Sequence, residues 1–126
     1  MTVLLDSSFV IDHLRGQPAA VERWARLFLD GEQACVNEIV VCEVRAGLHP
    51  EEESFLTTLL QPMEFVQPGP DGAMLAGRWR ADARRRGFTL SLADALIAAA
   101  AESVGASVLT RNVRDFELTP VRVQSY

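Results

Sequence analysis

Four acidic residues stand at positions from which carboxylates could act together: Asp6, Glu43, Asp94 and Asp115. Asp6 directly follows a short apolar run, Asp94 opens an alanine-rich segment, and Asp115 follows a second apolar run. Each of these three has an ordinary structural explanation when taken alone, because aspartate is common at helix caps and in turns. If all four acids converge, their repulsion must raise their pKa values or be offset by a cation. Oxygen ligands without histidine or thiolate favour Mg²⁺ or Mn²⁺.

Glu43 lies within the stretch NEIVVCEVRAGL, which is typical of an amphipathic helix. Ile39 and Val40 precede it by four and three residues, and Gly47 follows it by four, so the pattern places the carboxylate on the apolar face. Arg45 is two residues away and does not share that face. A buried charge without a partner is strongly unfavourable. We therefore expect a buried Glu43 that requires an arginine from elsewhere or a metal ion.

Asp94 follows Ser91 by three residues, which resembles a helix capping box with aspartate in place of the usual glutamate. Ile97, Ala98 and Ala101 lie on the same expected helix face. The pattern is therefore consistent with a cap alone, and also with a carboxylate on the buried side of the most apolar helix.

Other catalytic groups are poorly supported by the sequence. The two cysteines, Cys35 and Cys42, have no histidine at a metal-binding spacing, and His13 and His49 stand alone. These patterns argue against a disulfide framework, a zinc site and a Ser/His/Asp triad. The formal net charge of −5 argues against a nucleic-acid partner, unless the acids surround a metal ion.

The elements that must position the acids alternate between strands and helices. Short apolar runs predict strands at residues 3–5, 33–36, 63–66, 107–109 and 121–123. Apolar spacing and end signals predict helices at residues 6–14, 19–29, 37–48, 50–60, 71–86 and 92–103, with Asn37 and Ser91 as caps. This alternation predicts a three-layer α/β/α sandwich with a mainly parallel sheet of four to five strands. Ligands of such sheets bind beyond the carboxyl ends of the strands.

The length of 126 residues fits a single domain over residues 1–126. No apolar run approaches the roughly 20 residues needed to cross a bilayer, and a leader pattern is missing. We expect a cytoplasmic protein.

Three stretches resemble the PIN-domain ribonucleases, and among them the VapC toxins of toxin–antitoxin pairs. They are LLDSSFVIDHLRG, VNEIVVCEVRAGL and LSLADALIAAAAESVGASVLTRNVRDF, and a short closing strand follows them. The stretches occur in the family's order and spacing and cover about half of the chain. Each motif is loose by itself, whereas the ordered set is specific. The segment from about residue 50 to residue 87 carries no such signature.

The resemblance implies a PIN-like fold and assigns roles to residues. Asp6, Glu43 and Asp94 correspond to the family's metal ligands, and Asp115 corresponds to a fourth acid that completes a second ion's shell or positions the attacking water. The supporting residues implied by the motifs are Ser8, Thr110 and Asn112.

The resemblance also implies an activity and partners. The expected protein is an endoribonuclease that uses one or two Mg²⁺ or Mn²⁺ ions to hydrolyse phosphodiester bonds in tRNA, ribosomal RNA or messenger RNA. Its expected partner is a cognate VapB-type antitoxin that covers the acidic groove, and the expected assembly is a homodimer, with larger complexes in the presence of antitoxin. Arg111 and Arg114 adjoin the last acidic motif and are candidates for RNA contacts.

Two other functions fit part of the pattern. A non-catalytic module could use the acidic groove to bind a basic partner peptide. A Mg²⁺-dependent phosphotransfer protein would also carry an acid at the end of its first strand, but its signature needs a second aspartate where this chain has Ser8.

Overall fold

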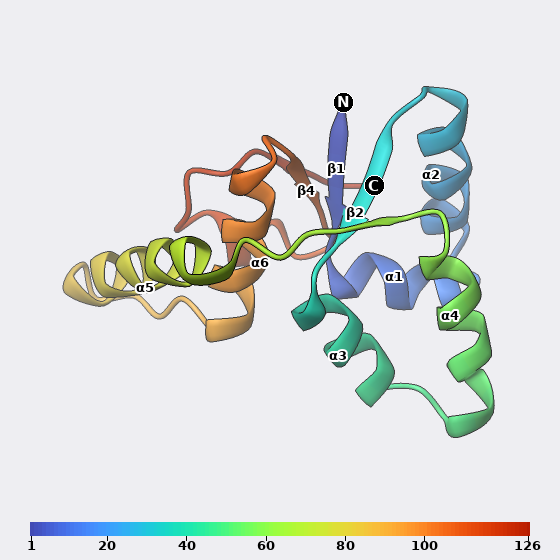
Figure 1. The fold of residues 1–126 in the computed structure, drawn as a ribbon, viewed down its shortest axis with the longest axis horizontal. Coiled ribbons are helices and arrows are strands. Elements are labelled where there is room, and N and C mark those ends of the chain that lie inside the picture. Colours follow the sequence, from blue (N-terminus) through green and yellow to red (C-terminus); the bar gives the residue numbers. More distant parts are fainter.

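Five parallel strands form the centre of the molecule in the computed structural model, which describes residues 1–126 (Figure 1). Their order across the sheet is β3-β2-β1-β4-β5. The strands are β1 (Thr2–Leu5), β2 (Gln33–Val36), β3 (Glu64–Phe65), β4 (Ser107–Leu109) and β5 (Val123–Gln124). All five predicted strands are present, but the last pairs two residues later than expected, because Val123 and Gln124 rather than Val121 align with Val108 and Leu109.

Helices cover both sides of this sheet, as the sequence predicted. They are α1 (Ser7–Leu14), α2 (Pro18–Leu29), α3 (Glu38–Ala46), α4 (Glu53–Leu60), α5 (Gly69–Arg85) and α6 (Leu92–Ser103). Two single 3₁₀ turns, η1 (Pro50–Glu52) and η2 (Val113–Phe116), complete the chain. In Figure 1, α5 and α6 lie on one side of the strands and α2 and α4 on the other, which is the expected three-layer arrangement.

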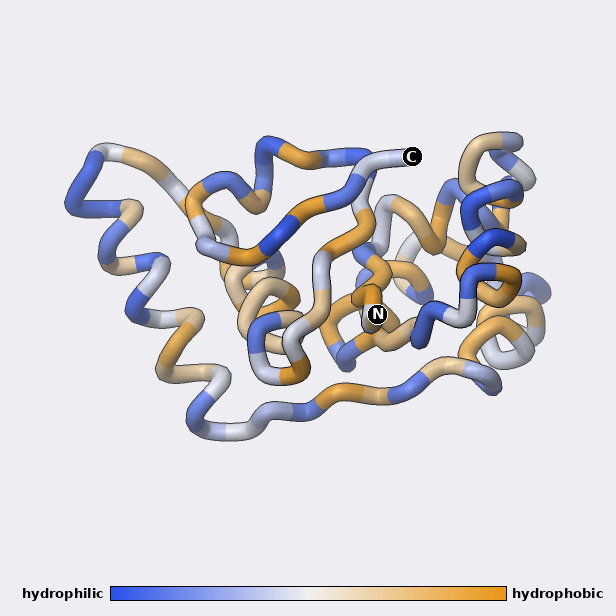
Figure 2. Tube along the Cα trace, turned by 90° about the horizontal axis from the view of Figure 1, so that it is seen from above, coloured by the Kyte–Doolittle hydropathy of each residue, from blue (hydrophilic) through white to orange (hydrophobic).

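The core is built mainly on the central strands, and Figure 2 shows hydrophobic residues gathered around the N-terminus, where β1 begins. Val3, Leu4 and Leu5 of β1 are fully buried, as expected for a strand covered on both faces. A second, smaller core cluster joins α5 to α6 through residues that are mostly alanines, including Ala83 and Ala95. Small side chains let two helices approach closely, so the start of α6 is held firmly against α5.

The strand order places a switch point between β1 and β4. From β1 the chain builds outward to β2 and β3 on one side, and later to β4 and β5 on the other. In open parallel sheets the crevice at such a point, beyond the carboxyl ends of the strands, is the usual ligand site. Asp6 and Thr110 are the first residues after these two strands.

Candidate active site

Asp6 is a buried carboxylate at the carboxyl end of β1, with a side chain that is held by two hydroxyl groups. Its residue exposure is 4%. Oδ2 accepts hydrogen bonds from Ser8 Oγ at 3.0 Å and from Thr110 Oγ1 at 2.8 Å. Asp6 occupies the N-cap position of α1, yet its side chain makes no capping hydrogen bond. Helix capping therefore does not explain this aspartate.

The two hydroxyl groups are themselves oriented by the backbone. Ser8 Oγ accepts from the Arg111 N–H at 3.1 Å, and Thr110 Oγ1 accepts from the Asn112 N–H at 2.9 Å. Each hydroxyl has a single proton and is placed to donate it to Oδ2 of Asp6, and the two hydroxyl oxygens also lie 3.2 Å from each other. Oδ1 receives no hydrogen bond and stays available to a ligand. Asn112 contributes its backbone N–H, whereas the sequence suggested its side-chain amide.

Glu43 lies on α3 and is exposed, so the predicted burial of this residue is wrong. Val40 and Val44 form the buried face of α3, and Glu43 lies next to that face, one residue before Val44. The Glu43 Oε1 atom accepts a hydrogen bond from Ser7 Oγ at 2.9 Å. This bond links α3 to α1, directly beside Asp6. Because an exposed carboxylate is hydrated, Glu43 does not require a cation or an arginine as a partner. The reason to group Glu43 with the other acids is its location beside Asp6.

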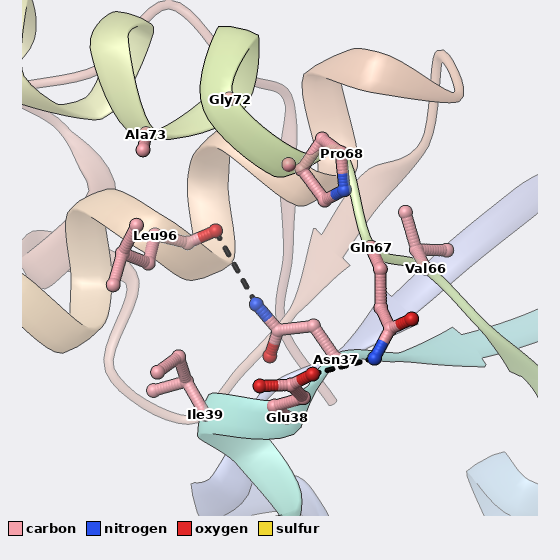
Figure 3. Close-up of a pocket in the computed structure, with 10 residues that line it drawn as sticks. Asn37, Glu38, Ile39, Val66, Gln67, Pro68, Gly72, Ala73 and Leu96 are labelled. Atoms are coloured by element: carbon pink, nitrogen blue, oxygen red, sulfur yellow. Dashed lines mark hydrogen bonds between the residues drawn. The ribbon is translucent and has the colours of Figure 1, made fainter.

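Asn37 joins the helix that carries Glu43 to the helix that carries Asp94 (Figure 3). Its Oδ1 accepts from the Val40 N–H at 3.1 Å, which confirms the predicted cap of α3. Its Nδ2 donates to the Leu96 carbonyl of α6 at 3.3 Å. One buried amide therefore caps α3 and fixes its start against α6. Sequence reasoning found the cap but not this second contact.

Asp94 lies half-buried in the first turn of α6. Ser91 caps this helix by accepting the Asp94 N–H at 3.1 Å, as predicted. Burial raises the pKa of Asp94 to about 6, and the negative charges of Asp115, Asp6 and Glu43 add to the rise, while a hydrogen bond with Ser91 opposes it. The fold thus brings the four acids, which are spread over the sequence, into one electrostatic neighbourhood.

The carboxylate oxygens of the four acids are suitable ligands for a hard divalent cation, but the acids lie too far apart to coordinate one together. No three acidic, histidine or cysteine side chains lie close enough together to hold an ion as they stand. Repulsion between charges acts over about 8–10 Å in physiological salt, whereas metal coordination requires distances of about 2.0–2.6 Å. The acids can therefore raise the pKa of Asp94 without lying close enough together to bind an ion. An ion would have to draw the helix-borne carboxylates toward Asp6.

Asp115 and Arg114 are exposed on η2, directly beyond β4. The neighbouring Phe116 is fully buried and anchors this turn in the core. Asp115 and Arg114 share a surface hollow with Asp94. Arg114 makes no salt bridge, so its guanidinium group is free to meet a ligand.

Arg111, the other predicted RNA contact, is paired within the protein. Its Nη1 atom donates to Oδ1 of Asp12 at 2.5 Å, and the Tyr126 hydroxyl donates to Oδ2 of Asp12 at 2.6 Å. The Tyr126 ring also packs edge-on against Phe9, at 5.0 Å between ring centroids. Burial and the Asp12 carboxylate raise the pKa of Tyr126. This cluster ties α1, the loop after β4 and the C-terminal residue together.

Sequence reasoning missed Asp12, although a signal was available. Asp12 follows Ser8 by four residues and Phe9 by three, so it lies on the same helix face as two residues that point into the protein. That face predicts a buried acid in need of a partner, which here is Arg111.

The family model for the PIN domain matches residues 3–120. The chain belongs to the PIN-domain family. This finding confirms the resemblance that the sequence motifs indicated.

None of the helices of this chain is both long enough and apolar enough to span a membrane.

Individual relatives of this PIN domain are VapC proteins. Ribonuclease VapC19 of Mycobacterium tuberculosis is 35% identical over 117 residues, which cover 93% of this chain and 94% of the relative. The tRNA(fMet)-specific endonuclease VapC of Salmonella typhimurium is 26% identical over 129 residues, covering 98% of this chain and 96% of that protein. The crystal structure of DNA-bound VapBC from Salmonella typhimurium contains a chain with a TM-score of 0.85 and 25% identity, covering 99% of this chain and 98% of its own.

Proposed function

We propose that this PIN-domain protein is an endoribonuclease toxin that uses Mg²⁺ or Mn²⁺ to hydrolyse phosphodiester bonds in cellular RNA. The observation that carries the proposal is the state of Asp6, which is buried and has one oxygen saturated by two oriented hydroxyl groups and the other oxygen free. Its relatives are named ribonucleases and endonucleases, in agreement with that chemistry.

The residues divide the work as follows. Asp6, Glu43 and Asp94 would bind the metal, and Asp115 would complete a second ion's shell or position the attacking water. A bound divalent ion supplies an activated water at neutral pH and a counter-charge for the pentavalent phosphorus centre. Ser8 and Thr110 keep Oδ1 of Asp6 directed to the site, because they occupy Oδ2. Ser7 holds Glu43 beside them.

We infer that the partner is a VapB-type antitoxin. Structural neighbours of this chain were solved as VapBC complexes, and some of those complexes are bound to DNA. We also propose that the chain acts in the cytoplasm as a single-domain protein, as a homodimer when free and in larger complexes when the antitoxin is bound.

The test is cleavage of total cellular RNA by purified protein freed of any partner, with Mg²⁺, with Mn²⁺ and with EDTA. Asp6→Asn and Asp94→Asn should each lower the cleavage rate by at least about 100-fold, since loss of a ligand exceeds the 10–100-fold effect of a supporting residue. Asp30→Asn is a matched control, because Asp30 is exposed at the end of α2, just before β2, and so lies near the starts of the strands rather than at their carboxyl ends, where Asp6 lies.

Cleavage that survives in both variants would contradict the catalytic assignment. If wild-type protein cleaves no cellular RNA with either metal but binds arginine-rich peptides through the acids, the acidic groove is a binding surface instead.

A further inference from the structure

A surface hollow adjoins the four acids on the side of η2 and the loop that joins α5 to α6. We call it the flanking hollow. It is lined by Phe88, Thr89, Asp94, Arg114, Asp115 and Leu118, among others. Asp94 and Asp115 belong to both the hollow and the acid cluster. A polymer that has one phosphate at the acids can therefore place a neighbouring nucleotide in the flanking hollow.

Phe88 is an exposed aromatic side chain in this hollow, carried by an ordered backbone. Its residue exposure is 57%. Gly87 ends α5 at φ +84°, a conformation that glycine adopts without strain. The Phe88 N–H then donates to the Ala83 carbonyl at 2.9 Å, and Arg80 Nε donates to the Leu90 carbonyl at 3.0 Å. The loop is thus pinned on both sides of Phe88, and its ring faces solvent from a fixed position.

Arg114 supplies a free positive charge in the same hollow. It is exposed and forms no salt bridge, although the acidic Asp115 and Glu117 line the same hollow. Arg111, by contrast, is paired with Asp12. An unpaired guanidinium group and an accessible aromatic ring are the two groups that sequence-tolerant sites use to bind single-stranded nucleic acid, through phosphate contact and base stacking.

We propose that the flanking hollow binds the nucleotide next to the cleaved phosphodiester bond, with its base stacked on Phe88 and its phosphate held by Arg114. This inference rests on the proposed ribonuclease function and extends it. A base inside a duplex is covered on both faces by its neighbours and cannot stack on Phe88. The proposed contact therefore requires the base next to the cleaved bond to be unstacked from its neighbours.

The first test compares cleavage kinetics on an oligoribonucleotide that contains the bond mapped by sequencing RNA ends. Phe88→Ala should lower kcat/KM about tenfold, mainly by raising KM, because one base–aromatic stack is lost. Phe88→Trp should keep activity within about twofold, since it restores a stacking surface. Phe55→Ala is the matched control, because Phe55 is 63% exposed on α4 and lines a different hollow.

Arg114 is tested by the salt dependence of binding. With Mg²⁺ replaced by Ca²⁺ to slow hydrolysis, Arg114→Gln should weaken binding of the same oligoribonucleotide and reduce the slope of log K against log salt by about 0.7, which corresponds to one phosphate contact on a single strand. An unchanged slope would remove Arg114 from the proposed contact.

The decisive test removes the base from the RNA. Two oligoribonucleotides carry an abasic nucleotide immediately before or immediately after the cleaved bond. One of them should lose about tenfold in kcat/KM with wild-type protein and lose little more with Phe88→Ala, since the stacking partner is then already missing.

The outcomes separate this inference from the proposed function. If wild-type protein cleaves and Asp94→Asn does not, while Phe88→Ala and both abasic substrates behave normally, the nucleotide subsite is wrong and the ribonuclease assignment stands. If Phe88→Ala instead reduces only dimerisation or antitoxin binding, Phe88 contacts protein, and the inference is overturned. If the wild type cleaves no RNA, both fail.

Discussion

The two sides of the acid cluster are built differently. Asp6 leaves the end of a fully buried strand, is itself buried, and has one oxygen fixed by two hydroxyl groups from α1 and from the end of β4. Glu43 and Asp115 are exposed, and the Glu43 carboxylate has one side-chain hydrogen bond, from Ser7. The strand side of the proposed site is therefore organised by the protein itself, whereas the helix side is free to adjust.

This difference has a physical reason and a consequence. A strand end is fixed by neighbouring strands, so the direction of its next side chain is set by the sheet itself. Exposed side chains on helices keep their rotamer freedom, which ion binding must remove. The absence of three acids at coordination distance is consistent with this division. Among residues that support the acids without being proposed ligands, we expect substitutions on the strand side to affect the site more strongly than those on the helix side.

The largest effect should come from Thr110, whose hydroxyl holds Asp6 and is fully buried. Thr110→Val keeps the shape but removes the donor to Asp6 and the acceptor for the Asn112 N–H. Metal affinity, measured from the rise in Tm with Mn²⁺, should fall about 10–100-fold. Thr110→Ser retains the hydroxyl and is the control. Equal affinity in the valine and serine variants would show that Asp6 is not organised by this contact.

The next effect concerns pH and Asp94. Because burial raises the folded-state pKa of Asp94 to about 6, above its value of 3.8 in the unfolded chain, its contribution to stability is present below pH 3.8 and is lost as the pH rises through about 6. In EDTA at pH 7, Asp94→Asn should therefore stabilise the protein. After discounting for a half-exposed group, the gain is about 1–2 kcal/mol.

Urea unfolding of wild type and Asp94→Asn measures this difference directly. It should be present at pH 7, should vanish near pH 4, and should shrink at pH 7 when Mn²⁺ is added to the wild type. A variant that is less stable than wild type at pH 7 without metal would contradict the account of the acid cluster.

A smaller effect is expected at Tyr126, the C-terminal residue, whose hydroxyl donates a hydrogen bond to Asp12 of α1. Tyr126→Phe keeps the ring that packs on Phe9 and removes only the hydroxyl. The free energy of unfolding should fall by about 1 kcal/mol, the usual contribution of one hydrogen bond. The change should be absent when Asp12 is already Ala, because the acceptor of the Tyr126 hydroxyl is then missing.

The smallest effect is expected on the helix side. Ser7→Ala removes the side-chain hydrogen bond to Glu43, but the carboxylate is exposed and remains hydrated. We expect less than about a threefold change in Mn²⁺ affinity, because an exposed hydrogen bond exchanges readily with water. A loss as large as that of Thr110→Val would mean that the helix side is organised in advance as well.

Much of the fold followed from local patterns. Every predicted strand and helix exists, since buried apolar runs, caps at Asn37 and Ser91, and glycine at helix ends are local signals. The last strand was misplaced by two residues, because its pairing depends on β4 and not on its own apolar residues.

Burial of individual acids was predicted less well. The spacing of apolar residues predicted that Glu43 is buried, but Glu43 is exposed. The same argument was not applied to Asp12, whose burial it would have predicted correctly. Periodicity defines the faces of a helix, but the width of the buried face depends on what packs against it. For α3 the buried face is limited to residues such as Val40 and Val44.

The sequence by itself determined which acids are candidates for the chemistry and at which element ends they lie, because acids that follow apolar runs are visible in the order of residues alone. Only the tertiary structure decided how they are held. Thr110 meets Asp6 across 104 positions of sequence, and Tyr126 meets Asp12 across 114. Such contacts arise from strand order and helix packing, which bring together residues that no local pattern connects.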